Sequence, residues 1–135
     1  VKRQPKVDWE KRDWLIVREL LTIERSIWQS LEGPRRSISW YCKQVAGRRT
    51  LEKKLSKLPL CQAFFIRHAE RVDEYQARRL ACIFTRLVLQ KRWLTPNYEI
   101  ERIAGLDQRK CREAGRKILT ESIPAWRISQ EISLR

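Results

Sequence analysis

Apolar residues recur at intervals of three and four along the first part of the chain, the spacing that gathers them on one face of an α-helix. Asp8 precedes this pattern as a helix cap, and Gly33-Pro34 follows it. We therefore predict one long amphipathic helix that ends near Gly33-Pro34. Its apolar positions are Trp9, Ile16, Leu20, Ile23, Ile27 and Leu31, and its polar positions include Arg18, Thr22, Arg25 and Gln29.

A second long helix is predicted to begin at Asp73, because Asp73 and Gln76 have the form of a capping box. Arg78, Arg79 and Arg86 occupy its polar side. The apolar positions again recur at three and four residues, at Tyr75, Leu80, Ile83, Phe84, Leu87 and Val88.

Two short helices are predicted to follow the first long helix. Ser37 caps the helix Ile38–Ala46, and Gly47 ends it in the left-handed conformation. Thr50 then caps a third helix, whose apolar face is Leu51, Leu55 and Leu58. Pro59 stops that helix and opens a semi-apolar one.

Two short helices are also predicted after the second long helix. Thr95-Pro96 opens the first, and Gly105 ends it. Asp107 caps a basic helix that reaches Leu119 and that Gly115 weakens by roughly 1 kcal/mol. The pattern fades after Ser122, so no element is predicted beyond it.

The phrase Val45-Ala46-Gly47 has a counterpart in Ile103-Ala104-Gly105, and each lies between two short helices. This layout is typical of a helix-turn-helix. The pattern predicts an all-α protein with tandem helix-turn-helix units, each a long helix followed by two short helices. The expected division is a linker over 1–7, a first unit over 8–70, a second over 71–122 and a C-terminal tail over 123–135.

The net charge of the chain indicates what kind of partner it binds. The 135 residues carry 30 Lys and Arg against 16 Asp and Glu, a formal net charge of +14. Such an excess attracts polyanions through counterion release and electrostatic steering. Together with the helix-turn-helix spacing, it favours double-stranded DNA over a charge that serves only solubility.

The sequence shows neither a membrane span nor a signal peptide. No apolar run approaches the roughly 18 residues of a membrane span, and Val1–Lys6 lacks the apolar core of a signal peptide. We expect a cytoplasmic protein with no membrane partner. The sequence has no methionine, so we expect it to be a piece of a longer protein.

The second short helix of a helix-turn-helix enters the major groove, where Arg and Lys read guanine and Gln reads adenine. In the first unit the candidates are Arg48, Arg49, Thr50, Lys53, Lys54 and Lys57. In the second unit they are Gln108, Arg109, Lys110, Arg112 and Arg116.

Further candidates lie at the start of the helix Ile38–Ala46. Arg35, Arg36 and Ser37 are placed to hold a phosphate there. Trp40 is the tryptophan best placed for a surface role, with packing as the even alternative. Trp9 and Trp28 are expected to help bury the first long helix.

No residue pattern in the sequence supports catalysis or metal binding. Cys42, Cys61, Cys82 and Cys111 are widely separated, and His68 is the single histidine. A zinc site needs paired ligands, and a nuclease needs clustered carboxylates. We therefore expect no enzyme, no metal and no cofactor, with buried thiols in a reducing compartment.

Four stretches, in order, resemble the C-terminal region of TnsD proteins, the TniQ-related target-site selectors of bacterial cut-and-paste transposons. Val7–Asp13 resembles V-D-W-x-x-R-D, Leu51–Pro59 resembles L-E-K-x-L-x-K-L-P, and Asp73–Arg79 resembles E-D-F-Q-x-R-R. Leu94–Leu106 matches L-T-x-W-x-I-x-R-x-A-G in part, with Asn97-Tyr98 where the family often has tryptophan. The zinc-binding N-terminal part of the family has no counterpart here.

The resemblance implies DNA binding at a chromosomal attachment site and recruitment of the transposition machinery, including its regulator ATPase. Two alternatives remain from the residues alone. One is a helical protein–protein adaptor within a transposition complex, whose charge serves acidic partners. The other is non-specific nucleic-acid binding, to RNA among others.

Overall fold

A computed structural model describes residues 6–106 and 109–134, and the regular elements among these residues are all helices, with no strand. The protein is therefore all-α, as the sequence predicts. The described residues form two compact units. The first comprises the residues up to Ser30 together with Arg36–Glu70, and the second comprises Leu31–Arg35 together with the residues from Arg71 onward.

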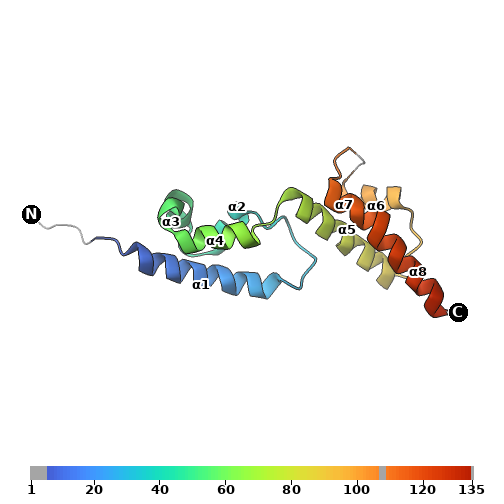
Figure 1. The fold of residues 1–135 in the computed structure, drawn as a ribbon, viewed down its shortest axis with the longest axis horizontal. Helices are drawn as coiled ribbons and strands as arrows, with labels where there is room; N and C mark the ends of the chain where they lie inside the picture. The colour runs from blue at the N-terminus through green and yellow to red at the C-terminus, as the bar shows by residue number, and fades with distance from the viewer. Residues whose placement is uncertain (1–5, 107–108, 135) are drawn as a thin grey trace, which may run out of the picture. The chain divides into compact units, whose positions relative to one another are not determined.

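The first unit is built on α1 (Trp9–Ile27), which lies beside α4 (Pro59–His68) (Figure 1). Asp8 caps α1 as predicted, since its carboxylate accepts the Lys11 N–H at 3.1 Å. The helix ends at Ile27, earlier than the predicted end near Gly33-Pro34. The physical reason is that Leu31–Pro34 belong to the second unit, where their backbone carbonyls accept hydrogen bonds from Arg78 and not from a helix backbone.

α2 (Ile38–Gln44), α3 (Arg48–Lys53) and a 3₁₀ turn at Leu55–Lys57 complete the first unit. Ser37 caps α2 as predicted, accepting the Trp40 N–H at 3.1 Å. Pro59 opens α4 as predicted. The core around these elements contains Leu20, Tyr41, Leu51, Leu58 and Cys61, each almost fully buried.

Two predictions for this region are wrong. Gly47 has φ −81°, so it does not end α2 in the left-handed conformation. It precedes α3 instead, and a Cβ at this position would lie 3.0 Å from Ile16 Cδ1, so glycine allows the turn to approach α1. Thr50 does not cap the third helix either, because α3 already begins at Arg48.

The second unit is built on α5 (Val72–Leu89). The predicted capping box of Asp73 and Gln76 is wrong. Arg71 caps α5, and its N–H donates to Glu74 Oε1 at 3.3 Å. Gln76 is buried, and its amide accepts the Arg112 N–H at 2.8 Å and donates to the Lys110 carbonyl at 2.8 Å. Gln76, which the local pattern assigned to a helix cap, therefore forms hydrogen bonds to a distant part of the backbone instead.

α6 (Asn97–Ala104) follows Pro96 and ends at Gly105 as predicted, and Gly105 adopts the left-handed conformation with a φ of +72°. Thr95 does not act as its cap, because its hydroxyl donates to the Arg92 carbonyl. Asp107, the predicted cap of the basic helix, lies outside the described residues.

The predicted basic helix to Leu119 is displaced. Arg109 and Lys110 form a turn, and α7 (Glu113–Lys117) begins only after it. α7 continues through a π-helical turn at Ile118–Ser122 into α8 (Ile123–Leu134) (Figure 1). The second unit thus contains the expected long helix and two short ones, and α8 follows them.

Residues assigned to a C-terminal tail contribute to the second core. Ile123 of α8 is buried, and the Trp126 ring packs edge-on against Phe84 with centroids 5.4 Å apart. Gly115 lets α7 approach α5, because a Cβ there would lie 3.2 Å from Leu80 Cδ1 of α5, and it would also lie 2.8 Å from Cys111 Sγ. Its value for packing explains a glycine in a helix, where it otherwise costs roughly 1 kcal/mol.

Candidate nucleic-acid interface

A three-residue turn, Val45–Gly47, joins α2 to α3. Val45 is buried in the core of the first unit, and the Ala46 N–H donates to Glu19 Oε1 of α1 at 3.3 Å. These contacts fix the turn against α1. Leu51 is the buried residue of α3, so the rest of the helix surface is directed away from the core.

Two of the predicted residues form the outermost face of α3. Successive helix positions turn by about 100°, so Arg49 and Lys53 lie on the side opposite Leu51, one turn apart. Both side chains are exposed. Arg49 and Lys53 therefore present two positive charges side by side on a short, rigid helix.

Arg48 lies on the flank of α3 and pairs with Glu52. Its Nε donates to Glu52 Oε1 at 2.9 Å, and the two side chains are 52% and 41% exposed. An exposed pair of this kind is worth about 0.3–0.5 kcal/mol. It orients Arg48 along the helix rather than outward.

The predicted residues around the end of α3 are placed differently from one another. Thr50 is half-buried, and its carbonyl accepts the Lys54 N–H that ends the helix. Lys54 and Lys57 are exposed. Lys57 Nζ lies 5.1 Å from the ring centroid of Trp9, which packs against the first core as predicted.

Residues ahead of α2 have structural partners. The Arg36 guanidinium donates to the Ser30 carbonyl at 2.7 Å, and the Arg36 backbone N–H donates to Glu70 Oε1 at 3.1 Å. The Ser37 hydroxyl serves as the α2 cap. Trp40 is half-buried and packs edge-on against Tyr41, with centroids 5.0 Å apart. The structure therefore engages these side chains in the fold.

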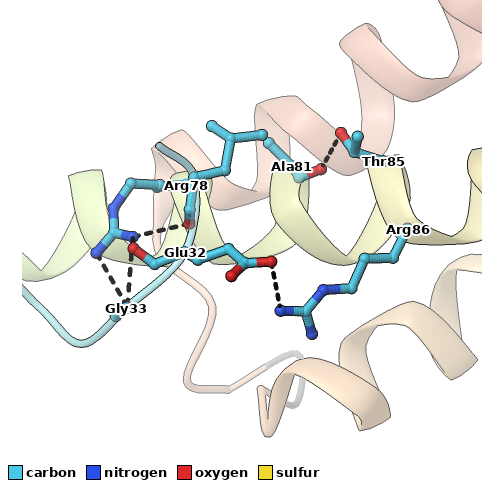
Figure 2. A network of polar contacts seen from close by, with 7 residues as sticks. Glu32, Gly33, Arg78, Ala81, Thr85 and Arg86 are labelled. Carbon is cyan, nitrogen blue, oxygen red and sulfur yellow. Dashed lines mark hydrogen bonds and ion pairs between the residues drawn. The ribbon is translucent and has the colours of Figure 1, made fainter. Parts of the chain in front are cut away.

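Arg35 is exposed and belongs to the segment Leu31–Arg35 of the second unit. Figure 2 shows how the neighbouring residues of this segment are held. Arg78 of α5 donates to the carbonyls of Leu31 and Glu32 at 2.8 and 2.9 Å, and it also reaches Gly33 and Pro34. Arg86 donates to the Glu32 carboxylate at 3.1 Å.

In the second unit, the turn after α6 carries the predicted residues. Arg109 and Lys110 are exposed and line a groove of about 580 Å³ with Tyr98, Glu101 and Arg102. Gln76 holds the backbone on the C-terminal side of this turn. The positive charges here project from an anchored loop and not from a helix.

Arg112 and Arg116 follow that turn. Arg112 precedes α7 and its side chain is exposed. The Arg116 Nε donates to the Cys111 carbonyl at 3.0 Å, so its guanidinium is partly engaged in the fold. Gln108, the remaining candidate, lies outside the described residues.

Sequence reasoning missed that several basic side chains hold the fold. Besides Arg78, the Arg79 Nε donates to the Ala104 carbonyl at 2.9 Å. Arg127 donates to the carbonyls of Trp93 and Thr95 at 2.7 and 2.6 Å. Arginine offers several donors in one plane, so it suits carbonyl groups left by irregular backbone. The basic excess therefore serves the fold as well as the surface.

Three of the buried thiols are held in their protonated form. Burial raises the pKa of the Cys42 and Cys111 thiols, and it raises the pKa of Cys61 to about 12 with help from the nearby Asp13. Such thiols stay protonated at neutral pH. In the described part of the chain, no three His, Cys, Asp or Glu residues come close enough to hold a metal ion.

None of the described helices combines the length and the apolar character needed to cross a membrane.

The chain is 36% identical over 119 residues to the Tn7 transposition protein TnsD of Escherichia coli. The match covers 85% of this chain and 22% of that protein, so the chain spans about a fifth of its relative's length. No protein-family profile and no solved structure matches the chain.

Proposed function

We propose that this chain, which is 36% identical over 119 residues to a TnsD transposition protein, belongs with the TnsD-type proteins, binds double-stranded DNA at a preferred sequence and so helps to select the insertion site of a transposon. The proposed role is one of binding, with no catalytic step. It is carried out in the bacterial cytoplasm, where chromosomal target DNA lies.

One observation carries the proposal. α2, its three-residue turn and α3 follow one another in the order of a helix-turn-helix, and Arg49 and Lys53 lie on the face of α3 opposite its buried side chain. In this motif the second helix enters the major groove. A groove-facing Arg or Lys there donates two hydrogen bonds to guanine O6 and N7, which is the commonest base-specific contact.

The other basic candidates around α3 are suited to phosphate. Arg48, Lys54 and Lys57 lie beside or beyond the end of α3, on its flanks. Contacts of this kind fix the orientation on the duplex and carry no sequence information of their own. Their contribution to affinity falls as salt rises, because phosphate binding releases counterions.

The second unit is proposed to bind the phosphate backbone of the DNA. Its basic residues Arg109 and Lys110 belong to a turn rather than to a helix, so no recognition helix presents them to base edges. A loop of basic side chains is compatible with phosphate binding. Base reading is therefore assigned to the first unit alone.

DNA binding alone does not deliver a transposon to its site. We propose that the complete protein, once bound, recruits the regulator ATPase and other transposition proteins. The similarity to a transposition protein supports this role, and it extends to a fifth of that protein's length.

Selection from a pool of randomised duplexes, followed by sequencing, tests base-specific binding over all short sequences at once. The expected result is one short enriched motif for this chain. For Arg49→Ala/Lys53→Ala, we expect affinity for that motif to fall by about 1–3 kcal/mol for each side chain that no longer reaches a base edge.

A matched control removes two charges elsewhere in the chain. Lys91→Asn/Arg92→Ala is suitable, because both side chains are exposed and asparagine tolerates the φ of 58° at Lys91. The control is expected to retain the motif and most of the affinity. A pool that yields no motif, or equal losses for the two double variants, would refute sequence-specific binding through α3.

A further inference from the structure

A second apolar stripe runs along α1, beside the face that enters the core. Ile16 and Leu20 point into the core, whereas Trp14, Val17 and Leu21 follow one another at three and four residues on the adjoining side, where Val17 packs against the edge of the core. Trp14 is 51% exposed and Leu21 is 42% exposed. Large apolar side chains gathered on one surface typically mark an interaction site.

α4 supplies the other wall of a groove along this stripe. Leu60, Ala63 and Phe64 face Trp14, Val17 and Leu21 across a groove of about 480 Å³. Leu60 is 46% exposed, whereas Phe64 is buried at the base. Two packed helices thus form an elongated apolar trough with large side chains on both sides.

The rim of this groove is basic. Arg18 and Arg67 line it, and the Arg18 guanidinium lies 4.6 Å from the ring centroid of Trp14. Arg25 continues the row of positive charge along α1, one helical turn beyond Leu21. The acidic side chain near the rim, Glu24, lies 3.8 Å from His68 Nδ1.

We infer that this groove docks an amphipathic helix of a partner protein, with apolar side chains on one face and Asp or Glu along its flanks. Helices commonly bind such troughs through anchors at i, i+3, i+4 and i+7. The basic rim selects acidic flanks, because opposite charges across an interface favour the right partner and repel the wrong one.

Charge also argues against a second copy of this chain as the occupant. Two identical grooves meeting face to face would bring Arg18, Arg25 and Arg67 of each copy toward those of the other. Duplex DNA is disfavoured by the apolar walls, since phosphates need polar donors rather than Trp14 and Leu60.

A synthetic helical peptide with leucine at i, i+3, i+4 and i+7 and flanking glutamates serves as the probe. A matched peptide carries lysine in place of every glutamate. Fluorescence anisotropy with the full 135-residue chain should show the glutamate peptide binding at least about tenfold more tightly than the lysine peptide.

Three variants locate the binding. Trp14→Ala should weaken the glutamate peptide about tenfold or more, since aromatic anchors carry much of an interface's affinity. Arg18→Glu/Arg67→Glu should reverse the preference between the two peptides. Ile66→Ser is the control, because Ile66 lies on α4 at 88% exposure and does not line the groove.

Helical circular dichroism of each variant checks that weaker binding does not come from unfolding. Equal binding of both peptides, or an Ile66→Ser effect as large as that of Trp14→Ala, would overturn the proposal. So would a dimer of the chain that Trp14→Ala dissociates, or displacement of the peptide by duplex DNA. The groove contains none of the α3 side chains, so DNA binding by Trp14→Ala should be unchanged, which separates this proposal from the proposed function.

Discussion

Replacing Asp13 by alanine removes a buried carboxylate that joins the two long elements of the first unit. Asp13 lies on α1 and is 2% exposed. Its Oδ2 accepts the Leu60 N–H at 2.9 Å, and its Oδ1 accepts the Cys61 N–H at 3.0 Å. Both donors belong to the first turn of α4, so a side chain 47 residues away caps that helix.

The expected cost follows from these two bonds. A helix cap contributes about 1 kcal/mol, and a hydrogen bond to a charged group contributes about 1.5–3 kcal/mol. Alanine leaves the Cys61 N–H buried without its acceptor, which adds to the cost. We expect Asp13→Ala to lower the free energy of unfolding of the first unit by roughly 2–4 kcal/mol.

Native-state amide exchange of the α4 backbone measures this change directly, with urea unfolding as the overall check. Asp8→Ala is the matched control, because Asp8 also caps a helix through one N–H but is exposed. Its cost should be at most about 1 kcal/mol. An Asp13→Ala cost no larger than that of Asp8→Ala, or equal destabilisation of α4 and α5, would refute the reasoning.

Three further predictions concern the packing at Gly115 and the buried thiol of Cys61. Gly115→Ala should destabilise the second unit by about 1–3 kcal/mol in urea unfolding, because the new Cβ would lie 2.8 Å from Cys111 Sγ; a stabilised variant would mean that helix propensity dominates there. Cys61, with its pKa raised to about 12 from 9.0, should resist iodoacetamide at pH 8.5 until the chain unfolds, and rapid labelling of the folded chain would contradict its burial. The same shift predicts a stability contribution that is present below pH 9 and is lost as the pH rises toward 12, because the unfolded thiol ionises first.

Local signals in the sequence predicted much of the fold. Asp8, Ser37 and Pro59 mark helix starts through interactions within one turn, and the structure confirms all three. Gly105 was likewise predicted to end a helix, and the structure confirms that α6 ends there. Features that depend on three or four neighbouring residues can be read from those residues.

Features that depend on distant partners could not be predicted in this way. Gln76 looks like half of a capping box, but its amide bonds to the backbone at Lys110 and Arg112. Gly47 and Gly105 close similar phrases, yet Gly47 serves a close approach to Ile16 and has an ordinary φ. Identical local patterns therefore conceal different roles in the two units.

For the candidate site, too, local signals could be predicted from the sequence, whereas features that depend on exact helix ends could not. The placement of basic residues after the first turn identified α3, but the pairing of Arg48 with Glu52 depends on where the helix begins. Trp28 was expected to be buried and is 63% exposed, because α1 ends at Ile27. An error of a few residues in a helix end thus changes which side chains face outward.

The central claim is that Arg49 and Lys53 of α3 read base edges. The most direct measurement is the ratio of affinities for the selected duplex and for a shuffled duplex of equal composition, at one salt concentration, for the unaltered chain and for Arg49→Ala/Lys53→Ala. The account predicts a large ratio for the unaltered chain that falls toward one in the variant. An unchanged ratio, with affinity reduced equally on both duplexes, would show that these residues contact only phosphate and would contradict the claim.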